Sequence, residues 1–244
     1  MKIIVKKDYK ELSREAANII SDEIKSNPSM ILGLATGSTP IGTYEELIRM
    51  HNEEGLDFSK IITFNLDEYL KIPYNNPNSY HYFMEDNLFN HVNINTDNIH
   101  IPDGNAEDRE DVCIEYDKKI KQAGGIDLQV LGIGENGHIA FNEPAPALSL
   151  GTHVTDLTES TIKANSRFFD SIDEVPKKAI TMGIGSIMKS KKILLLANGE
   201  KKAHIIAKIL KEGKITTEIP ASLLLLHPDA TVIMDEAAAK EYLR

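Results

Sequence analysis

Short apolar runs and longer amphipathic segments alternate along the whole chain. Residues 30–34, 61–64 and 192–197 are mostly apolar, and runs of this length are typical of strands buried on both faces. Residues 9–25 instead repeat apolar side chains at helical spacing, which predicts an amphipathic helix. The same criteria predict strands at 3–5, 30–34, 61–64, 126–131, 152–157, 179–182, 192–197 and 230–234, with 152–157 at an edge. They predict helices at 9–25, 40–53, 80–89, 108–122, 160–169, 201–210 and 236–243.

Particular residues mark where these elements begin and end. Thr39 is a suitable N-cap for the second helix, with Pro40 at its first position. Gly124 follows the helix at 108–122 and is expected to end it. Residues 66–79 contain two prolines and three asparagines, so we expect them to form turns.

The alternation of strands and helices predicts an α/β fold. We expect a single-domain, doubly wound, mostly parallel sheet with helices on both faces, as in Rossmann-like proteins. The 244 residues suffice for one such domain, spanning 1–244. Ligands of these folds bind beyond the carboxyl ends of the strands. Three polar segments follow predicted strands at that edge: residues 36–39, 65–69 and 132–143.

Composition narrows the possible partners. The chain has 27 Lys and Arg against 37 Asp and Glu, a formal net charge of −10, and it lacks a long basic block. A nucleic-acid partner is therefore not expected. No apolar run approaches the roughly 20 residues of a membrane span, and the early charges at the N-terminus are unlike a signal peptide. The single Cys113 leaves no internal disulfide. We expect a cytoplasmic protein without a membrane partner.

The most informative segment runs from Gly132 to Pro144. Gly132, Gly134 and Gly137 fit the Gly-x-Gly-x-x-Gly pattern of dinucleotide-binding proteins. That pattern requires a helix directly after the glycines, and Pro144 and Pro146 would break such a helix. We therefore expect neither a nicotinamide nor a flavin cofactor.

The same segment places His138 between Asn136 and Glu143, either of which could orient the imidazole. A histidine with such a partner is suited to proton transfer. A lone histidine is more often a structural or surface residue, and metal binding is a further alternative. No His-x-x-x-His or cysteine pair accompanies it, so we expect no metal.

The segment Thr36–Thr39 lies between a predicted strand and a helix. Gly37 permits close approach of the backbone, the hydroxyls of Thr36, Ser38 and Thr39 add donors, and a helix N-terminus favours an anion. A phosphate group would fit there. A plain turn with a helix cap explains the same residues equally well.

Three charged residues are further candidates. Asp67 follows a predicted strand, where a carboxylate can act as a general base, although an Asp-Glu pair is more often a solvated turn or a helix cap. Arg167 and Lys202 could bind an anion, although a lone Arg is more often a solvated helix residue and Lys202 could be a solvated residue at a helix start. Lys202 lies at a predicted helix start, where a cation is unfavourable unless an anion is bound.

Four motifs together resemble one family. They are Leu34–Pro40, Phe64–Tyr69, Gly137–Pro144 and Asn165–Phe169, and the match extends over nearly the whole chain. In these motifs the sequence is similar to the glucosamine-6-phosphate deaminase family. The resemblance implies conversion of glucosamine 6-phosphate and water into fructose 6-phosphate and ammonia, without a cofactor. It implies a sugar phosphate as partner and a monomer or a homo-oligomer.

The resemblance also assigns roles to residues of this chain. Asp67 is implied to remove the C2 proton, and His138 to open the sugar ring with support from Glu143 and Asn136. The implied sugar-phosphate site consists of Thr36, Gly37, Ser38, Thr39, Arg167 and Lys202. Many family members have Asp where this chain has Asn136. An amide cannot supply the negative charge, so we expect Asn136 to orient the pair of His138 and Glu143.

Other interpretations remain open at this point. A 6-phosphogluconolactonase-like hydrolase could use the same scaffold, and a non-catalytic sugar-phosphate sensor could use the same binding site. The short elements and the proline near the start of residues 145–169 suggest that about this segment forms a lid.

Overall fold

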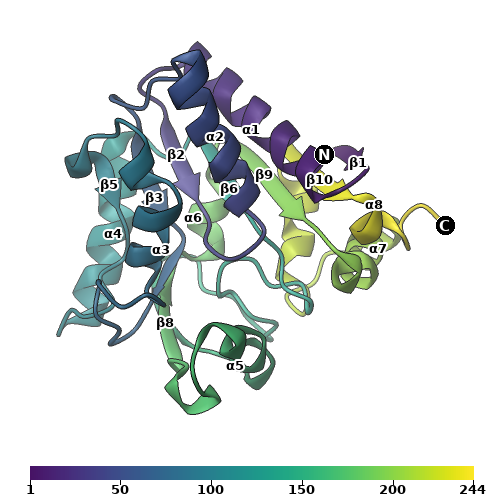
Figure 1. Cartoon of the computed structure of the whole chain (residues 1–244). Helices are drawn as coiled ribbons and strands as arrows, with labels where there is room; N and C mark the ends of the chain where they lie inside the picture. Colours follow the sequence, from purple (N-terminus) through teal and green to yellow (C-terminus); the bar gives the residue numbers. More distant parts are fainter.

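A seven-stranded parallel sheet forms the centre of the molecule (Figure 1). The computed structural model describes residues 1–244, apart from the side chain of Phe168. The strand order is β1-β10-β9-β6-β2-β3-β5, and every pair of neighbours is parallel. The strands are β1 (Lys2–Lys6), β2 (Ile31–Leu34), β3 (Ile62–Asn65), β5 (Ile99–His100), β6 (Leu128–Leu131), β9 (Lys192–Ala197) and β10 (Ala230–Asp235).

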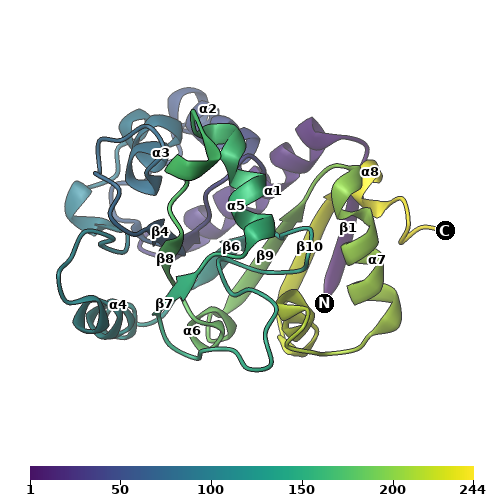
Figure 2. The ribbon, with the colours of Figure 1, turned by 90° about the horizontal axis from the view of Figure 1, so that it is seen from below.

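Two hydrophobic clusters cover the two faces of this sheet. Successive strand residues alternate between the clusters: Leu194 packs on one face and Leu195 on the other. One face carries α1 (Tyr9–Ser26), α2 (Ile41–Glu54) and α3 (Tyr80–Asn87). The other carries α4 (Arg109–Ala123), α6 (Ile184–Met188) and α7 (Ala203–Glu212). Figure 2 shows α1, α2 and α3 on one side of the sheet, with α4 and α6 on the other.

A second, three-stranded antiparallel sheet lies beyond the carboxyl ends of the parallel strands. Its order is β4 (Asp67–Tyr69), β8 (Lys178–Thr181) and β7 (His153–Asp156). The helix α5 (Glu159–Asn165) belongs to the connection between β7 and β8. In Figure 1, α5 and β8 lie below the main sheet, on the side toward which β2 points. The second sheet therefore covers the edge where ligands of parallel sheets bind.

The predicted parallel sheet with helices on both faces is confirmed. Gly124 ends α4 as expected, with a left-handed φ of 106°. Residues 66–79 were expected to be turns only, but β4 lies within them, and its pairing with the distant β8 explains why local composition missed it. The last helix, α8 (Glu236–Ala239), is shorter than predicted, and β5 and α6 were not predicted.

The predicted cap of α2 is wrong. The helix begins at Ile41, after Pro40, without a side-chain cap from Thr39. The Tyr9 hydroxyl instead accepts a hydrogen bond from the Gly42 N–H at 2.8 Å. The Thr39 hydroxyl is used elsewhere, because it donates to Asn198 Oδ1 at 2.6 Å. A contact across 159 residues thus replaces the local one.

Gly104 provides a test of how β4 is held. A Cβ at Gly104 would lie 2.0 Å from the carbonyl oxygen of Tyr69, so Gly104→Ala must displace β4 or the loop. We expect a loss of about 1–3 kcal/mol in the free energy of unfolding, measured by urea denaturation. Gly132→Ala is the control, because a Cβ there meets nothing within 4 Å. Equal urea-denaturation midpoints for both variants would show that this close approach does not affect the stability of the protein.

Candidate active site

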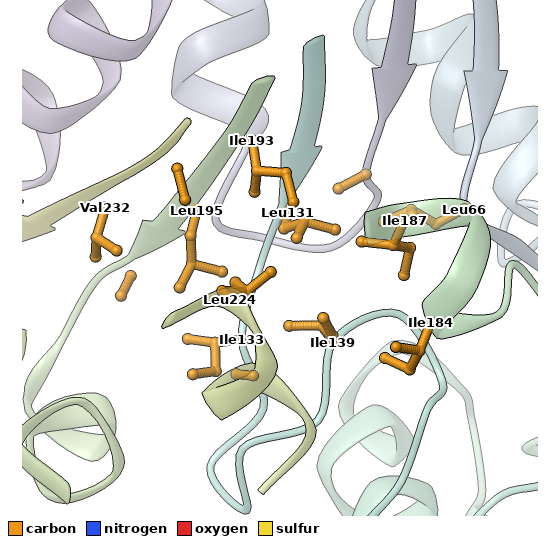
Figure 3. Packing of buried hydrophobic residues seen from close by; sticks show 14 of the residues in the cluster. Leu66, Leu131, Ile133, Ile139, Ile184, Ile187, Ile193, Leu195, Leu224 and Val232 are labelled. Atoms are coloured by element: carbon orange, nitrogen blue, oxygen red, sulfur yellow. The ribbon is translucent and has the colours of Figure 1, made fainter. Parts of the chain in front are cut away.

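A tight turn brings His138 and Glu143 together. The Asn142 N–H donates to the Ile139 carbonyl at 3.1 Å, and Ala140 between them has a left-handed φ of 52°. Ile139 is fully buried in the hydrophobic cluster under the sheet, where Figure 3 shows it near Ile133 and Leu224. The turn is therefore anchored in the core directly beside the histidine.

Glu143 accepts hydrogen bonds on both carboxylate oxygens. Its Oε2 accepts from His138 Nδ1 at 3.2 Å and from Asn136 Nδ2 at 2.8 Å, and its Oε1 accepts from the Thr161 hydroxyl. Burial alone would raise the pKa of Glu143, but the hydrogen bond and the charge interaction with His138, together with the hydrogen bonds from Thr161 and Asn136, outweigh it and lower the pKa to about 2. Glu143 is thus a buried carboxylate that stays ionised beside the imidazole.

Asn136 supports this pair in a different way from the expected one. Its Oδ1 accepts from the backbone N–H of His138 at 3.2 Å, while its amide donates to Glu143. The sequence offered Asn136 as a partner that could orient the imidazole, whereas in the structure it bonds the carboxylate of Glu143 and the backbone of His138. An Asn can form both bonds at once, because its side chain has a donor and an acceptor.

Gly134 makes room for the imidazole. A Cβ at this position would lie 2.4–2.6 Å from three atoms of the His138 ring. Gly137 has a φ of 88°, and a Cβ there would lie 2.7 Å from Ile219. Two glycines of the Gly-x-Gly-x-x-Gly pattern therefore have local roles. Gly134 leaves space for the His138 ring, and Gly137 provides a left-handed backbone and leaves space for Ile219.

Asp67 lies in β4, opposite Thr181 of β8, with 6% of its surface exposed. Burial, together with the neighbouring charge of Glu68, raises the pKa of Asp67 to about 8. Among the described residues, none donates a hydrogen bond to its carboxylate. A carboxyl group with these properties is suited to accept a proton near neutral pH.

Glu68, the next residue, has a structural role. Its carboxylate accepts hydrogen bonds from the N–H groups of Tyr69, Tyr80 and His81, and from His81 Nδ1 at 2.8 Å. It thereby binds the first turn of α3, where a negative charge is favourable. For Glu68 the helix-cap interpretation is correct, although the residue is fully buried rather than solvated.

Cationic side chains meet the loop after β2. Arg167 donates to the Ser38 hydroxyl at 3.2 Å. The pKa of Lys202 is lowered by burial and by the nearby charges of Arg167 and Lys201, which outweigh the opposite effect of Glu135. Thr36 and Gly37 are half-buried beside them, and Gly37 has a φ of 95°. Crowded cations next to a helix N-terminus favour the binding of an anion.

Two residues that the sequence did not single out hold the parts of this cationic site: the loop after β2 and the turn before Lys202. Asn198 links the loop after β2 to the end of β9 through Thr39. Asp235, at the end of β10, accepts from the Gly199 N–H at 3.0 Å and from the Ala238 N–H at 2.8 Å. It thus fixes the turn that leads to Lys202. No sequence motif marks Asn198, because it acts on a segment far away along the chain. Asp235 caps the adjacent α8 locally, but its bond to Gly199 joins a distant segment.

The described residues form no cluster of three or more His, Cys, Asp or Glu side chains placed to hold a metal ion. None of the helices in the described part of the chain has the length and apolar composition that a membrane crossing requires. In the motif Asn165–Phe169, Phe168 lies outside the described side chains, whereas Asn165 donates to the Tyr69 hydroxyl at 2.8 Å.

Comparison with known proteins identifies the family. A model described as glucosamine-6-phosphate isomerases/6-phosphogluconolactonase matches residues 6–234. The chain belongs to this family. Family members from Clostridium perfringens (strain 13) and Thermoanaerobacter pseudethanolicus, both named glucosamine-6-phosphate deaminase, are 58% and 56% identical to it. Each alignment covers 98% of this chain, with 99% and 94% of the respective relatives.

Solved structures of the family share the fold. A structure described as a monomeric glucosamine-6-phosphate deaminase aligns with a TM-score of 0.97 and 50% identity, over 99% of this chain and 100% of that one. A 6-phosphogluconolactonase from Thermotoga maritima aligns with a TM-score of 0.74 and 24% identity, over 96% and 98%. The second likeness shows the fold alone.

The contact between Gly134 and His138 can be tested directly. Gly134→Ala is expected to displace the imidazole, because its Cβ would overlap the ring. The NMR chemical shifts of the His138 ring should then change, because the displaced ring no longer forms its hydrogen bond with Glu143. Gly132→Ala lies two residues away in open space and should leave these shifts unchanged. Unchanged shifts in Gly134→Ala would contradict this account of the glycine.

Proposed function

We propose that the protein is a glucosamine-6-phosphate deaminase, which converts glucosamine 6-phosphate and water into fructose 6-phosphate and ammonia. Relatives with this name at 56–58% identity support the proposal, as does the structure at 50% identity. The observation that carries it is the buried Asp67, whose pKa is raised to about 8. A base of this kind is needed to remove a proton from carbon, whereas hydrolysis of a lactone requires none at C2.

In this proposal the phosphate group fixes the substrate first. Thr36, Gly37, Ser38 and Thr39 supply backbone and hydroxyl donors, while Arg167 and Lys202 supply positive charge. The contact of Arg167 with Ser38 supports this assignment, since it unites the two parts of the site. Phosphate binding energy then holds the sugar so that the groups beyond it act on adjacent carbon atoms.

His138 then opens the sugar ring. The closed pyranose has no carbonyl, so a proton must leave the C1 hydroxyl and another must reach the ring oxygen. The Nδ1 atom of His138 donates to Glu143, so Nε2 is available for these transfers. Glu143 stays ionised and stabilises the imidazolium that forms, while Asn136 holds both partners.

Asp67 acts on the open-chain aldehyde. It takes the proton from C2 while the aldehyde oxygen at C1 takes up a proton, which gives an enolamine. The proton held by Asp67 then goes to C1, and the amine gives up a proton, so that C2 becomes an imine. The resulting imine at C2 reacts with water, ammonia leaves, and the ketone of fructose 6-phosphate remains. Atoms balance, because one water supplies the carbonyl oxygen of the product and the two hydrogens that leave with the nitrogen.

We also propose that residues 158–176 form a mobile cover within a single domain. The sequence suggested a lid at about 145–169. The Leu157 N–H donates to the Lys177 carbonyl at 2.8 Å, which closes the two ends of this connection. Residues 149–156, in contrast, are bonded to α6 and β8. We propose a cytoplasmic enzyme; a monomer would match the solved deaminase described as monomeric, and a homo-oligomer is the alternative.

The central test is an ammonia-release assay with Asp67→Asn. An amide cannot accept the C2 proton, so we expect at least about a 100-fold loss of kcat, the scale of general-base catalysis. In the unaltered protein, Asp67 must be deprotonated, so kcat/KM should rise with pH through about 8. Lactone hydrolysis that survives in Asp67→Asn, without ammonia release by either protein, would support the hydrolase alternative instead.

Residue 136 can be tested by comparing two variants. Asn136→Ala removes a hydrogen bond to Glu143, while Asn136→Asp also adds a negative charge against that carboxylate. We expect the pKa of Glu143 to rise from about 2 in both, and further in Asn136→Asp, because like charges disfavour ionisation. Carbon-13 NMR titration of the carboxyl group measures this. Identical titrations in the two variants would mean that charge at this position has no effect.

A further inference from the structure

A short chain of hydroxyl groups reaches Glu143 from α5. The Thr158 hydroxyl donates to Thr161 Oγ1 at 3.1 Å, and the Thr161 hydroxyl donates to Glu143 Oε1. Thr161 has 4% of its surface exposed and Glu143 has 8%, so the bond between them is shielded from water. Hydrogen bonds from neutral donors to a buried carboxylate are among the stronger ones in proteins.

This contact comes from the segment proposed above as a cover. Residues 158–176 make three polar contacts with separate parts of the site: Thr161 with Glu143, Asn165 with Tyr69, and Arg167 with Ser38. The last contact reaches the proposed phosphate site, and the first reaches the proposed ring-opening pair. One segment therefore touches both the group that binds the substrate and the group that reacts with it.

We propose that Thr161 is a positioning residue that couples the placement of residues 158–176 to the alignment of Glu143 with His138. The proposal rests on the deaminase function stated above. When a bound phosphate draws Arg167 and its segment into place, Thr161 fixes Glu143, and the ring-opening pair is complete. When the segment is displaced, Glu143 loses that restraint.

The geometry of the carboxylate explains how one hydroxyl can do this. Glu143 Oε2 already accepts from His138 and Asn136, which leaves Oε1 to set the plane of the group. Because Thr161 holds Oε1, Oε2 stays directed at Nδ1, and the opposite ring nitrogen stays directed toward the substrate. His138 is the titratable group that faces Glu143, since Thr161 and Asn136 are neutral.

The experiment compares Thr161→Val, which keeps the shape but removes the hydroxyl, with Thr161→Ser, which keeps the hydroxyl. Thr161→Val should lower kcat for ammonia release about tenfold, the scale of one hydrogen bond to a charged group. KM should change little, because the phosphate site is intact. Thr161→Ser should retain most of the activity. If Thr161→Val does not fold, Thr161→Ala removes the same hydroxyl.

An isotope effect separates positioning from general damage. With substrate deuterated at C2, a slower ring opening hides the C2 step, so the isotope effect on kcat should fall toward unity in Thr161→Val. Thr158→Ala is the structural control, because it removes the N-cap of α5 and leaves the Thr161 hydroxyl beside Glu143. Thr158→Ala should lower the free energy of unfolding, while kcat should fall less than in Thr161→Val, because the Thr161 hydroxyl can still donate to Glu143.

Several results would overturn the proposal. They are an unchanged kcat in Thr161→Val, a reduced kcat with an unchanged isotope effect, or equal loss in Thr161→Ser and Thr161→Val. If the unaltered protein releases no ammonia, the proposed function fails, and the contact is still tested by NMR titration. Thr161→Val must then raise the pKa of Glu143, which Thr161 helps to lower. An unchanged titration would show that the contact has no effect on the carboxylate.

Discussion

The end of β8 holds the two proton-transfer segments of the site in register. Thr181 pairs with Asp67 across the antiparallel sheet, and its hydroxyl accepts from the Phe141 N–H at 3.0 Å. Met182 donates to the Leu66 carbonyl at 2.7 Å and accepts from the side chain of Asn142 at 2.9 Å. These three hydrogen bonds, together with the pairing of β4 and β8, join the strand that carries Asp67 to the turn that carries His138 and Glu143. Each bond joins two buried polar groups of the backbone or side chains. Breaking one would therefore leave an unpaired buried group and displace both segments.

The turn held by β8 also stores strain. Ala140 adopts a left-handed conformation that costs a residue with a Cβ about 1–2 kcal/mol. The burial of Ile139 and the bonds of Asn142 offset that cost, so the strained conformation persists. Strain of this kind gathers where a chain must place two side chains in a fixed relation. Here the two side chains are His138 and Glu143, five residues apart.

Much of the main sheet could be predicted from the sequence because apolar runs report burial directly. β9 extends over the predicted residues 192–197. In the small sheet, β7 and β8 overlap predicted strands, but β4 could not be predicted, since it is three residues long and is a strand only because distant β8 pairs with it. For the same reason the sequence assigned Thr39 to a local cap, while the structure gives its hydroxyl to Asn198.

The candidate site could likewise be predicted only in part from the sequence. The sequence offered Asn136 and Glu143 as possible partners of His138, and the prolines after the glycines argued against a nucleotide. The need for a glycine at position 134 could not be predicted from the sequence, because it depends on where the ring of His138 lies. Thr161 and Asn198 carry no local signal, since each contributes one hydroxyl or amide to a segment brought near by folding. Asp235 caps α8 locally, but its bond to Gly199 could not be predicted for the same reason.

The two buried carboxyl groups of the site are tuned in opposite directions by their surroundings. Asp67 receives no hydrogen bond from the described residues and lies beside Glu68, so its pKa rises to about 8. Glu143 is also buried but receives three hydrogen bonds and lies beside the imidazole of His138, so its pKa falls to about 2. Burial raises both, and the donors decide the difference. Groups separated in this way are suited to different tasks: one exchanges protons near neutral pH, while the other keeps a fixed charge beside a histidine.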